Sequence, residues 1–379
     1  MSSTTEKSLL GIGLIGSGFM GRCHANAFGA VSGLFDLPAQ PVKAMLADAT
    51  DEIAQAGASA LGFARATSDW QEMIADDAVD IVAITAPNIL HEPMALAAIA
   101  AGKTVYCEKP LSTTAASALK MTEAAEVSGV VTSVGFNFLR NPMVALAREI
   151  IASGEIGEVT GFRGRHAENY MANPDAPHSF RTDPQGGGAL ADIGSHIISM
   201  ARHLLGPIAE VSADCQTIYP TRPVAAGATE RSPVVVDDMT HALVRFDSGV
   251  AGSIEANWAA TGRTMDLSFE VTGSKGAISF SQENMNELLV YSGSGAGAGY
   301  KRIEAGPSHP PYDRFCPAPG HHLGFNDLKI IEVAELIDAH MSRGKCTPDF
   351  REAWAVQQTV EAMQTSSQEH CWITVGGAT

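Results

Sequence analysis

The sequence of 379 residues contains six cysteines but no pair of the C-x-x-C type. Zinc ribbons and small disulfide-stapled domains depend on clustered cysteines, so this scattered spacing excludes both classes. The cysteines are therefore predicted to be reduced thiols, which are typical of cytoplasmic proteins. The N-terminal segment 1–7 also lacks the basic and apolar regions of a signal peptide. We expect a cytoplasmic location.

Basic residues are scarce as well, because 25 Lys and Arg stand against 42 Asp and Glu, a formal net charge of −17. This imbalance argues against a general affinity for nucleic acid or for anionic membrane surfaces. No apolar run reaches the length that spans a bilayer. The rest of the composition, 45% hydrophobic and 18% charged residues, is that of a globular protein, and the length favours two domains.

The first motif is an apolar run that ends in Gly16-x-Gly18-x-x-Gly21 and precedes a helix-compatible segment. In a strand–turn–helix unit the first glycine allows a tight turn, the second lets a pyrophosphate approach the backbone, and the third allows helix and strand to pack closely. The anion then lies on the unpaired N–H groups of the helix N-terminus. The motif predicts a dinucleotide-binding turn that includes Phe19 and Met20, although many such glycines form ordinary turns.

An acidic residue, Asp48, ends the next predicted strand, residues 42–48. An acid at this point accepts hydrogen bonds from the adenosine ribose and repels a 2′-phosphate. It lies further from the glycines than the usual ~20 residues, which an inserted loop at residues 31–41 explains. No Lys or Arg occurs between residues 44 and 64, so the sequence favours NAD over NADP. The alternative is that Asp48 only caps the helix that begins near Thr50.

Helix and strand patterns continue to alternate as far as residue 134, which predicts a Rossmann domain, a doubly wound parallel sheet, over residues 1–137. Functional residues of such sheets gather at the carboxyl ends of the strands. The residues that we expect to line the cofactor crevice there are Thr85, Pro87, Asn88, His91, Glu108, Lys109 and Asn137.

Residues 138–379 are predicted to form an α+β domain for substrate binding and oligomerisation. Strand-like segments joined by short turns follow one another between residues 158 and 291. This pattern indicates a large, open, mostly antiparallel sheet. Amphipathic segments near residues 141–154, 325–343 and 350–366 predict helices on one face of that sheet.

Asp192 and His196 follow a triple glycine at the start of a predicted helix. Residues four apart share a helix face, so both side chains are predicted to point into one pocket. Histidine suits proton transfer because its unperturbed pKa, about 6.5, lies close to working pH. The alternatives are a helix-start role for Asp192, a satisfied buried imidazole for His196 and a solvated loop charge for Lys109.

Four motifs together resemble those of the Gfo/Idh/MocA oxidoreductases, over nearly the whole chain. They are the glycine fingerprint, Thr85-Ala86-Pro87-Asn88 with His91, Glu108-Lys109-Pro110, and Asp192-x-Gly194-x-His196. The resemblance implies that lysine, aspartate and histidine form the catalytic set. His196 is then the general acid/base, Lys109 stabilises the developing alkoxide and Asp192 orients either partner. It also implies that the bond before the motif's proline is often cis, and that dimers or tetramers form through the sheet of the second domain.

The activity that this resemblance implies is an NAD-dependent dehydrogenation of a CH–OH group. The expected substrate is a cyclic polyol or sugar, of the inositol, monosaccharide, anhydrosugar or glycoside type. One alternative is a non-catalytic dinucleotide-binding transcriptional regulator of the same fold, which has no need for all three catalytic residues. Another is an NADP-linked carbonyl reductase, which Asp48 disfavours.

The irregular stretch 170–188 precedes the catalytic helix and holds Tyr170, His178 and Arg181. We expect these side chains to line the substrate side together with His196. Arg163 and Arg165 are further candidates. Each of these residues is equally compatible with a place on the surface or on a sheet face.

A metal site is a weaker interpretation of the same histidines. Asp192, His196 and the pair His321-His322 offer mixed ligands. Catalytic zinc usually takes three protein ligands, and no H-E-x-x-H or paired-cysteine motif supports one here. A mechanism with NAD and a lysine needs no metal, so none is expected.

Overall fold

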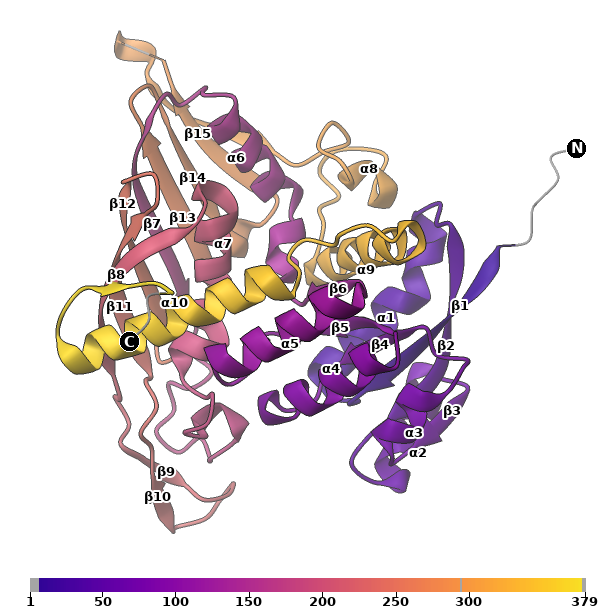
Figure 1. The fold of residues 1–379 in the computed structure, drawn as a ribbon. Coiled ribbons are helices and arrows are strands. Elements are labelled where there is room, and N and C mark those ends of the chain that lie inside the picture. The colour runs from indigo at the N-terminus through magenta and orange to yellow at the C-terminus, as the bar shows by residue number, and fades with distance from the viewer. Residues whose placement is uncertain (1–6, 294, 377–379) are drawn as a thin grey trace, which may run out of the picture. The chain divides into compact units, whose positions relative to one another are not determined.

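The computed structural model describes residues 7–293 and 295–376, and contacts divide the chain into two units (Figure 1). The first unit comprises residues 1–112, 116–140 and 324–354, and the second comprises 113–115, 141–323 and 355–379. The first unit is thus not a continuous segment that ends at residue 137. Its last part, 324–354, comes from the region that the sequence analysis had placed in the second domain.

The first unit is built on a six-stranded parallel sheet in the order β3-β2-β1-β4-β5-β6. The strands are β1 (Ser8–Ile15), β2 (Ala39–Ala47), β3 (Arg65–Thr67), β4 (Ile81–Ile84), β5 (Thr104–Cys107) and β6 (Thr132–Val134). The order reverses between β1 and β4, and this is the point where open α/β sheets bind ligands. The Rossmann prediction is confirmed.

The helices of the first unit alternate with these strands. They are α1 (Phe19–Leu34), α2 (Asp51–Leu61), α3 (Trp70–Ala75), α4 (His91–Ala100) and α5 (Ala115–Ser128), and α9 (Phe325–Ser342) comes from the late segment. Helix α9 packs against α1. The ring of Phe325, the first residue of α9, stacks on that of Phe19, with ring centroids 6.2 Å apart.

The second unit is built on a nine-stranded sheet in the order β16-β15-β14-β13-β7-β12-β11-β8-β17, in which only β7 and β12 pair in parallel. Its strands are β7 (Val159–Ala167), β8 (Ile208–Gln216), β11 (Met239–Phe246), β12 (Ala251–Asn257), β13 (Asp266–Gly273), β14 (Ala277–Ser281), β15 (Glu287–Ser292), β16 (Gly299–Glu304) and β17 (Ile373–Thr374). A two-stranded ribbon, β9 (Thr221–Pro223) with β10 (Arg231–Pro233), leaves the sheet between β8 and β11. The predicted open, mostly antiparallel sheet is confirmed.

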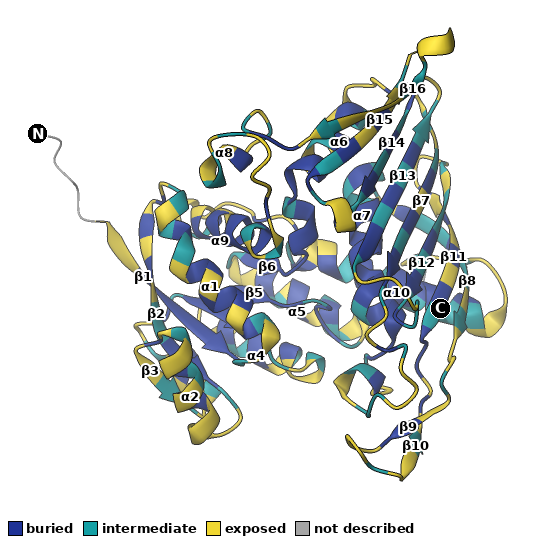
Figure 2. Cartoon of the chain, turned by 180° about the vertical axis from the view of Figure 1, so that it is seen from behind, coloured by how far each residue is buried: buried dark blue, intermediate teal, exposed yellow. Residues whose placement is uncertain are grey.

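The two faces of this sheet differ in what covers them. Helices α6 (Pro142–Ala152) and α7 (Ser195–Leu205) pack against one face, and α10 (Phe350–Glu369) bonds to β8 through Ser366 and Ser367. Along β11 the side chains alternate between buried and exposed, as Figure 2 shows for the strands of the sheet. His241, Leu243 and Arg245 are exposed on the face away from the helices. This alternation is expected of a sheet with one covered face.

A buried ion pair joins distant segments of the second unit. Arg222 and Asp238 are both fully buried, and Arg222 Nη2 donates to Asp238 Oδ1 over 3.1 Å. Trp258 Nε1 donates to the same oxygen over 2.6 Å, and Arg222 also donates to the carbonyl oxygen of Met171. Burial of such charges is tolerated because each has partners.

No helix among residues 7–293 and 295–376 has both the length and the apolar character that a membrane crossing requires. All six cysteines are free thiols.

Candidate active site

The glycine turn joins β1 to α1, and each glycine has a separate structural reason. Gly16 has a φ of +95°, which favours glycine. A Cβ on Gly21 would lie 2.1 Å from the carbonyl oxygen of Gly16, so helix and turn approach more closely than a side chain permits. A Cβ on Gly18 would meet no atom within 4 Å, so the space above this residue is open. This pattern fits a turn that receives a pyrophosphate.

Asp48 holds the same turn from the end of β2. Its Oδ2 accepts hydrogen bonds from Ser17 N (2.8 Å) and Ser17 Oγ (2.6 Å), and its Oδ1 accepts one from Ala49 N (2.7 Å). The cap of α2 is Thr50, whose side chain accepts from Ile53 N. The capping alternative for Asp48 is therefore wrong. Ser17, which the sequence analysis did not single out, connects the carboxylate to the glycines.

Thr85 directly follows β4 and His91 begins α4, and both side chains contact backbone carbonyl groups of the crevice. Thr85 Oγ1 lies 2.8 Å from the carbonyl oxygen of Ile15 and 2.9 Å from that of Gly16. His91 is fully buried, with Nδ1 2.9 Å from the carbonyl oxygen of Pro110 and Nε2 2.9 Å from that of Ala86. Burial lowers the pKa of His91. Both ring nitrogens are occupied by the loops that contain Ala86 and Pro110. His91 therefore supports the crevice by joining these two loops.

The Glu108-Lys109-Pro110 motif follows β5, and the peptide bond before Pro110 is cis, as expected. Glu108 is buried, and its Oε1 contacts Lys329 and His24, while its Oε2 accepts from the backbone N–H of Lys109 over 3.2 Å. The structure therefore directs this carboxylate into the unit, although the sequence analysis placed it in the cofactor crevice. The side chain of Lys109 is partly exposed.

The residues of the first unit fit an NAD molecule. The N-terminus of α1 has no side-chain cap, so its N–H groups are available to an anion. The side-chain nitrogen of Asn137 is buried and has no hydrogen-bond partner among the described residues. The glycine turn would hold the pyrophosphate, Asp48 the ribose hydroxyls and Asn137 a further polar group. Pro87 and Asn88 lie beside Thr85 at the carboxyl end of β4.

In the second unit, Asp192 is the centre of a polar cluster. Its Oδ2 accepts from Tyr170 OH (2.8 Å) and from Arg181 Nε (3.0 Å). Arg181 lies over the rings of Tyr170 and Phe180, and Tyr170 packs edge-on against Trp258. Burial and the nearby Asp192 raise the pKa of Tyr170, so its hydroxyl remains a donor. Tyr170 and Arg181, predicted on the substrate side, thus surround Asp192.

His196 is the second residue of α7 and is 7% exposed, and its ring centroid lies 5.6 Å from that of His166 near the end of β7. The ring nitrogens of His166 lie 2.9 Å from the carbonyl oxygen of Ile193 and 2.9 Å from Glu168 Oε1. The sequence analysis missed this pair.

Asp192 lies in a short π-helix, Leu190–Gly194, and not in a regular α-helix as expected. Such wide turns are frequent at functional sites. Asp237 anchors its start, because its Oδ2 accepts from Leu190 N (2.8 Å) and Thr240 Oγ1 (3.0 Å). Burial raises the pKa of Asp237 to about 6.

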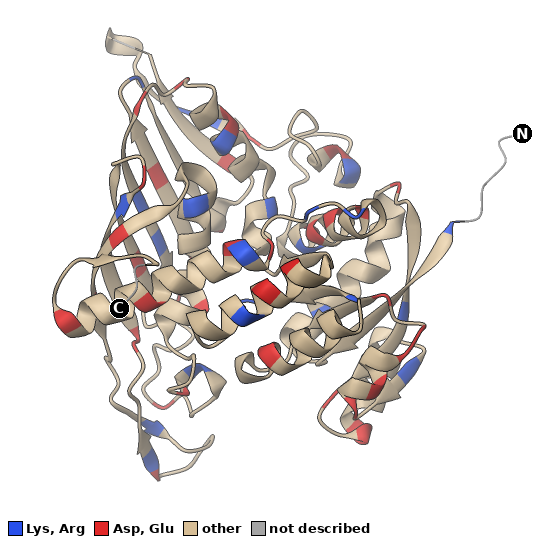
Figure 3. Cartoon of the chain, in the orientation of Figure 1, with Lys and Arg blue, Asp and Glu red and all other residues tan. Residues whose placement is uncertain are grey.

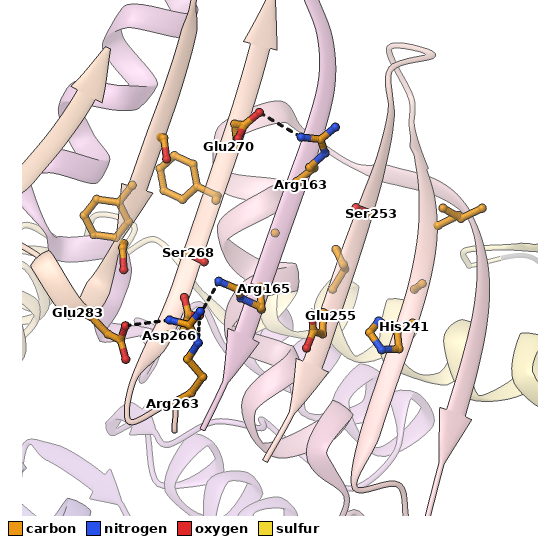
Figure 4. Close-up of a pocket in the computed structure, with 18 of the residues that line it drawn as sticks. Arg163, Arg165, His241, Ser253, Glu255, Arg263, Asp266, Ser268, Glu270 and Glu283 are labelled. Atoms are coloured by element: carbon orange, nitrogen blue, oxygen red, sulfur yellow. Dashed lines mark hydrogen bonds and ion pairs between the residues drawn. The ribbon is translucent and has the colours of Figure 1, made fainter. Parts of the chain in front are cut away.

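The other substrate candidates lie elsewhere. One ring nitrogen of His178 lies 3.0 Å from Thr182 Oγ1, and the other lies 3.1 Å from the carbonyl oxygen of Ser232. These contacts indicate a structural role for His178. Arg163 and Arg165 alternate with His166 along β7, so they lie on the uncovered face of the sheet and pair with Glu270 and Asp266 (Figure 4). The sequence was equally compatible with substrate binding and with a position on a sheet face, and these two arginines have the second.

The part of the chain that the structure describes contains no group of three or more His, Cys, Asp or Glu side chains that could hold a metal ion. His322 lies 3.5 Å from Glu304, and this pair is largely exposed.

Comparison with known proteins gives matches along most of the chain. Residues 10–136 match the model of an oxidoreductase family with an NAD-binding Rossmann fold, and residues 144–279 match the GFO/IDH/MocA C-terminal domain. The chain is 36% identical to levoglucosan dehydrogenase from Pseudarthrobacter phenanthrenivorans, over 97% of this chain and 98% of that protein. It is 28% identical to myo-inositol 2-dehydrogenase from Thermotoga maritima, over 74% of this chain and 77% of the relative. A solved levoglucosan dehydrogenase in complex with NADH and levoglucosan has a TM-score of 0.94 at 37% identity, covering 98% of this chain and all of that one.

The contact of Asp48 with Ser17 makes cofactor preference testable. Asp48→Ser should weaken NADH binding, because the ribose hydroxyls lose their acceptor. It should also reduce the preference for NADH over NADPH, because the 2′-phosphate of NADPH no longer meets a carboxylate. Fluorescence titration of both cofactors measures this ratio. Asp80→Ser is the control, since Asp80 holds Gly11 N by the same kind of bond (2.7 Å) at the start of β4. A wild-type protein that prefers NADPH would contradict the role given to Asp48.

The raised pKa of Asp237 predicts a pH-dependent stability. Its folded value, about 6, lies above the ordinary 3.8, so the folded state binds this proton more tightly and loses stability as pH rises between these values. The loss amounts to at most about 3 kcal/mol. Asp237→Asn mimics the protonated acid and should gain stability over wild type as pH rises from 4 to 6.5. Urea unfolding at several pH values measures the difference, and a difference that is constant with pH would refute the assignment.

Proposed function

Because this chain belongs to the Gfo/Idh/MocA family of NAD-binding oxidoreductases, we propose that it oxidises a secondary hydroxyl of a cyclic sugar or polyol to a ketone. The observation that carries the proposal is the cluster of Tyr170, Arg181 and Asp192 beside the turn that bears His196. A cytoplasmic setting is part of the proposal, because all six thiols are unpaired.

An anhydrosugar of the levoglucosan type is the substrate class that we favour. The support is the identity to levoglucosan dehydrogenase along the whole chain, which exceeds that to the inositol dehydrogenase. The side chains of the second unit agree with a ring that has apolar C–H faces and polar edges. Tyr170 and Phe180 are partly exposed aromatic rings, and Asp192 and Arg181 supply acceptors and donors next to them.

The chemistry follows from the residue types. NAD supplies the hydride acceptor when it is bound. His196 takes the hydroxyl proton as the carbon loses its hydride, and returns this proton to solvent afterwards. Lys109 stabilises the negative charge that develops on the substrate oxygen. Asp192, fixed by Tyr170 and Arg181, orients the reacting groups, and the low exposure of His196 keeps competing water away.

Turnover of variants tests these roles. Lys109→Ala and His196→Ala should retain NADH binding, since neither residue belongs to the glycine turn or contacts Asp48. Loss of the acid/base should reduce turnover by ~10²–10⁴-fold, and loss of the charge stabiliser by a comparable ~10²–10³-fold. Asp192→Asn should lose less. Initial rates of NADH formation with levoglucosan, myo-inositol and D-xylose measure the effects, and near-normal turnover in either alanine variant would remove that residue from the mechanism.

The uncovered face of the nine-stranded sheet supports self-association. It contains a hollow of about 950 Å³ lined by strands β7, β8 and β11–β14 (Figure 4). Acidic and basic residues occur at interspersed positions along the strands (Figure 3), with ion pairs such as Arg165–Asp266 and Arg163–Glu270. Leu243 adds an exposed apolar side chain. A face with balanced charges and an exposed apolar side chain can meet its own symmetry mate without net repulsion, so we expect a homodimer or homotetramer through this face.

Leu243→Arg should weaken this association, because it buries an unpaired charge at the contact. Light scattering at micromolar concentration should show an oligomer for wild type and a smaller mass for the variant. Val127→Arg is the control, since Val127 is 90% exposed on α5 of the first unit. A strictly monomeric wild-type protein would rule out the proposed assembly.

A further inference from the structure

A buried polar cluster lies behind the Glu108-Lys109-Pro110 motif, entirely within the first unit. Its five side chains, which we call the Glu108 network, are His24 of α1, Tyr106 and Glu108 of β5 and its end, and Lys329 and Glu332 of α9. Four of them are fully buried and Glu108 is 5% exposed. A cluster of this charge content needs a reason to persist in a protein interior, since each buried ion costs several kcal/mol.

Lys329 connects the members of this network. Its Nζ donates to Tyr106 OH (2.9 Å), Glu108 Oε1 (3.0 Å) and Glu332 Oε2 (2.8 Å), which uses all three N–H bonds of the ammonium. Tyr106 OH also donates to Glu332. Although burial alone would lower the pKa of Lys329, the two carboxylates raise it, so this lysine stays charged.

The carboxylate of Glu108 is held from two sides. Burial alone would raise its pKa, but Lys329 and His24 hold the pKa well below its ordinary value, so the group is ionised. His24 Nε2 lies 2.7 Å from Glu108 Oε1, and burial lowers the pKa of His24, so a neutral imidazole donates from Nε2. A Cβ on Gly135, the residue after β6, would lie 2.5 Å from Oε1, so the backbone here closes a further side of the carboxylate. The carboxylate has one orientation available.

The second oxygen of this carboxylate accepts from the backbone N–H of Lys109 over 3.2 Å. With Oε1 fixed by Lys329 and His24, Oε2 is held at that N–H. The network therefore reaches from α1, which begins at the glycine turn, to the lysine of the motif. Helix α9 supplies the ammonium that completes this connection.

We propose that Lys329 is a positioning residue for Lys109, because it fixes the Glu108 carboxylate that holds the Lys109 backbone. This inference rests on the proposed catalytic role of Lys109. Without Lys329 the carboxylate turns or moves, and the Lys109 segment loses its support. Displacement of a catalytic group by about 1 Å can reduce turnover by ~10²-fold.

A pair of variants in the same helix turn separates positioning from stability. Lys329→Met removes the ammonium from Glu108 at nearly equal volume. Glu332→Gln changes the acid that touches Lys329 and Tyr106 but not Glu108. Both variants should lower the melting temperature and retain NADH affinity. Lys329→Met should lose turnover by ~10–10²-fold, whereas Glu332→Gln should stay close to wild type.

Thermal melts, NADH titration and kcat are measured on the full chain for wild type, both variants and Lys109→Ala. If Lys329→Met does not fold, Lys329→Met/Glu332→Met removes one buried carboxylate along with the ammonium and should fold with low turnover. The proposal is overturned if turnover falls in proportion to melting temperature in both single variants. It is also overturned if turnover recovers in the double variant. Normal turnover of Lys109→Ala would instead refute the proposed function of that lysine, so the two failures are distinguishable.

Discussion

A buried charge needs a partner, and in both units this requirement holds distant segments of the chain together. In the first unit the ammonium of Lys329 joins Glu108 and Glu332, so a helix from near the end of the chain is part of the Rossmann unit. In the second unit Arg222 and Asp238 form a buried ion pair, and Trp258 donates a hydrogen bond to Asp238. Breaking such a pair leaves an uncompensated charge, which is costlier than never having buried it. Segments distant in sequence are fixed together in this way.

The parts of the site that were predictable from the sequence are those whose chemistry is local. The glycine turn needs its residue types at fixed spacing. Gly16 has the positive φ, Gly18 the open space and Gly21 the close packing that such a turn requires. The parallel and antiparallel sheets were also predictable, because alternation and run length reflect which faces are covered. Asp48 was predicted at the end of its strand, but its bond to Ser17 was not, since that contact depends on the path of the turn.

The features that the sequence did not predict depend on contacts between distant segments. Lys329 and Glu332 lie on the buried side of an amphipathic helix, and a helical pattern does not reveal that a charge at such a position has a partner more than 200 residues away. The place of α9 depended on such contacts too, because residues 324–354 group with the first unit and α9 packs against α1. His91 and Glu108 were expected to face the cofactor, yet their polar atoms are used within the protein. The π-helix at Asp192 requires a backbone widening that i, i+4 spacing does not predict.

Strand β7 shows how one element serves two purposes in the second unit. Successive side chains of a strand point to opposite faces, so His166 faces His196 while Arg163 and Arg165 face the open surface. A change in register by one residue would move each of these side chains to the opposite face of the sheet. The pairing of β7 with β12 and β13 on its two sides therefore fixes both the face that carries His166 and the face proposed for association.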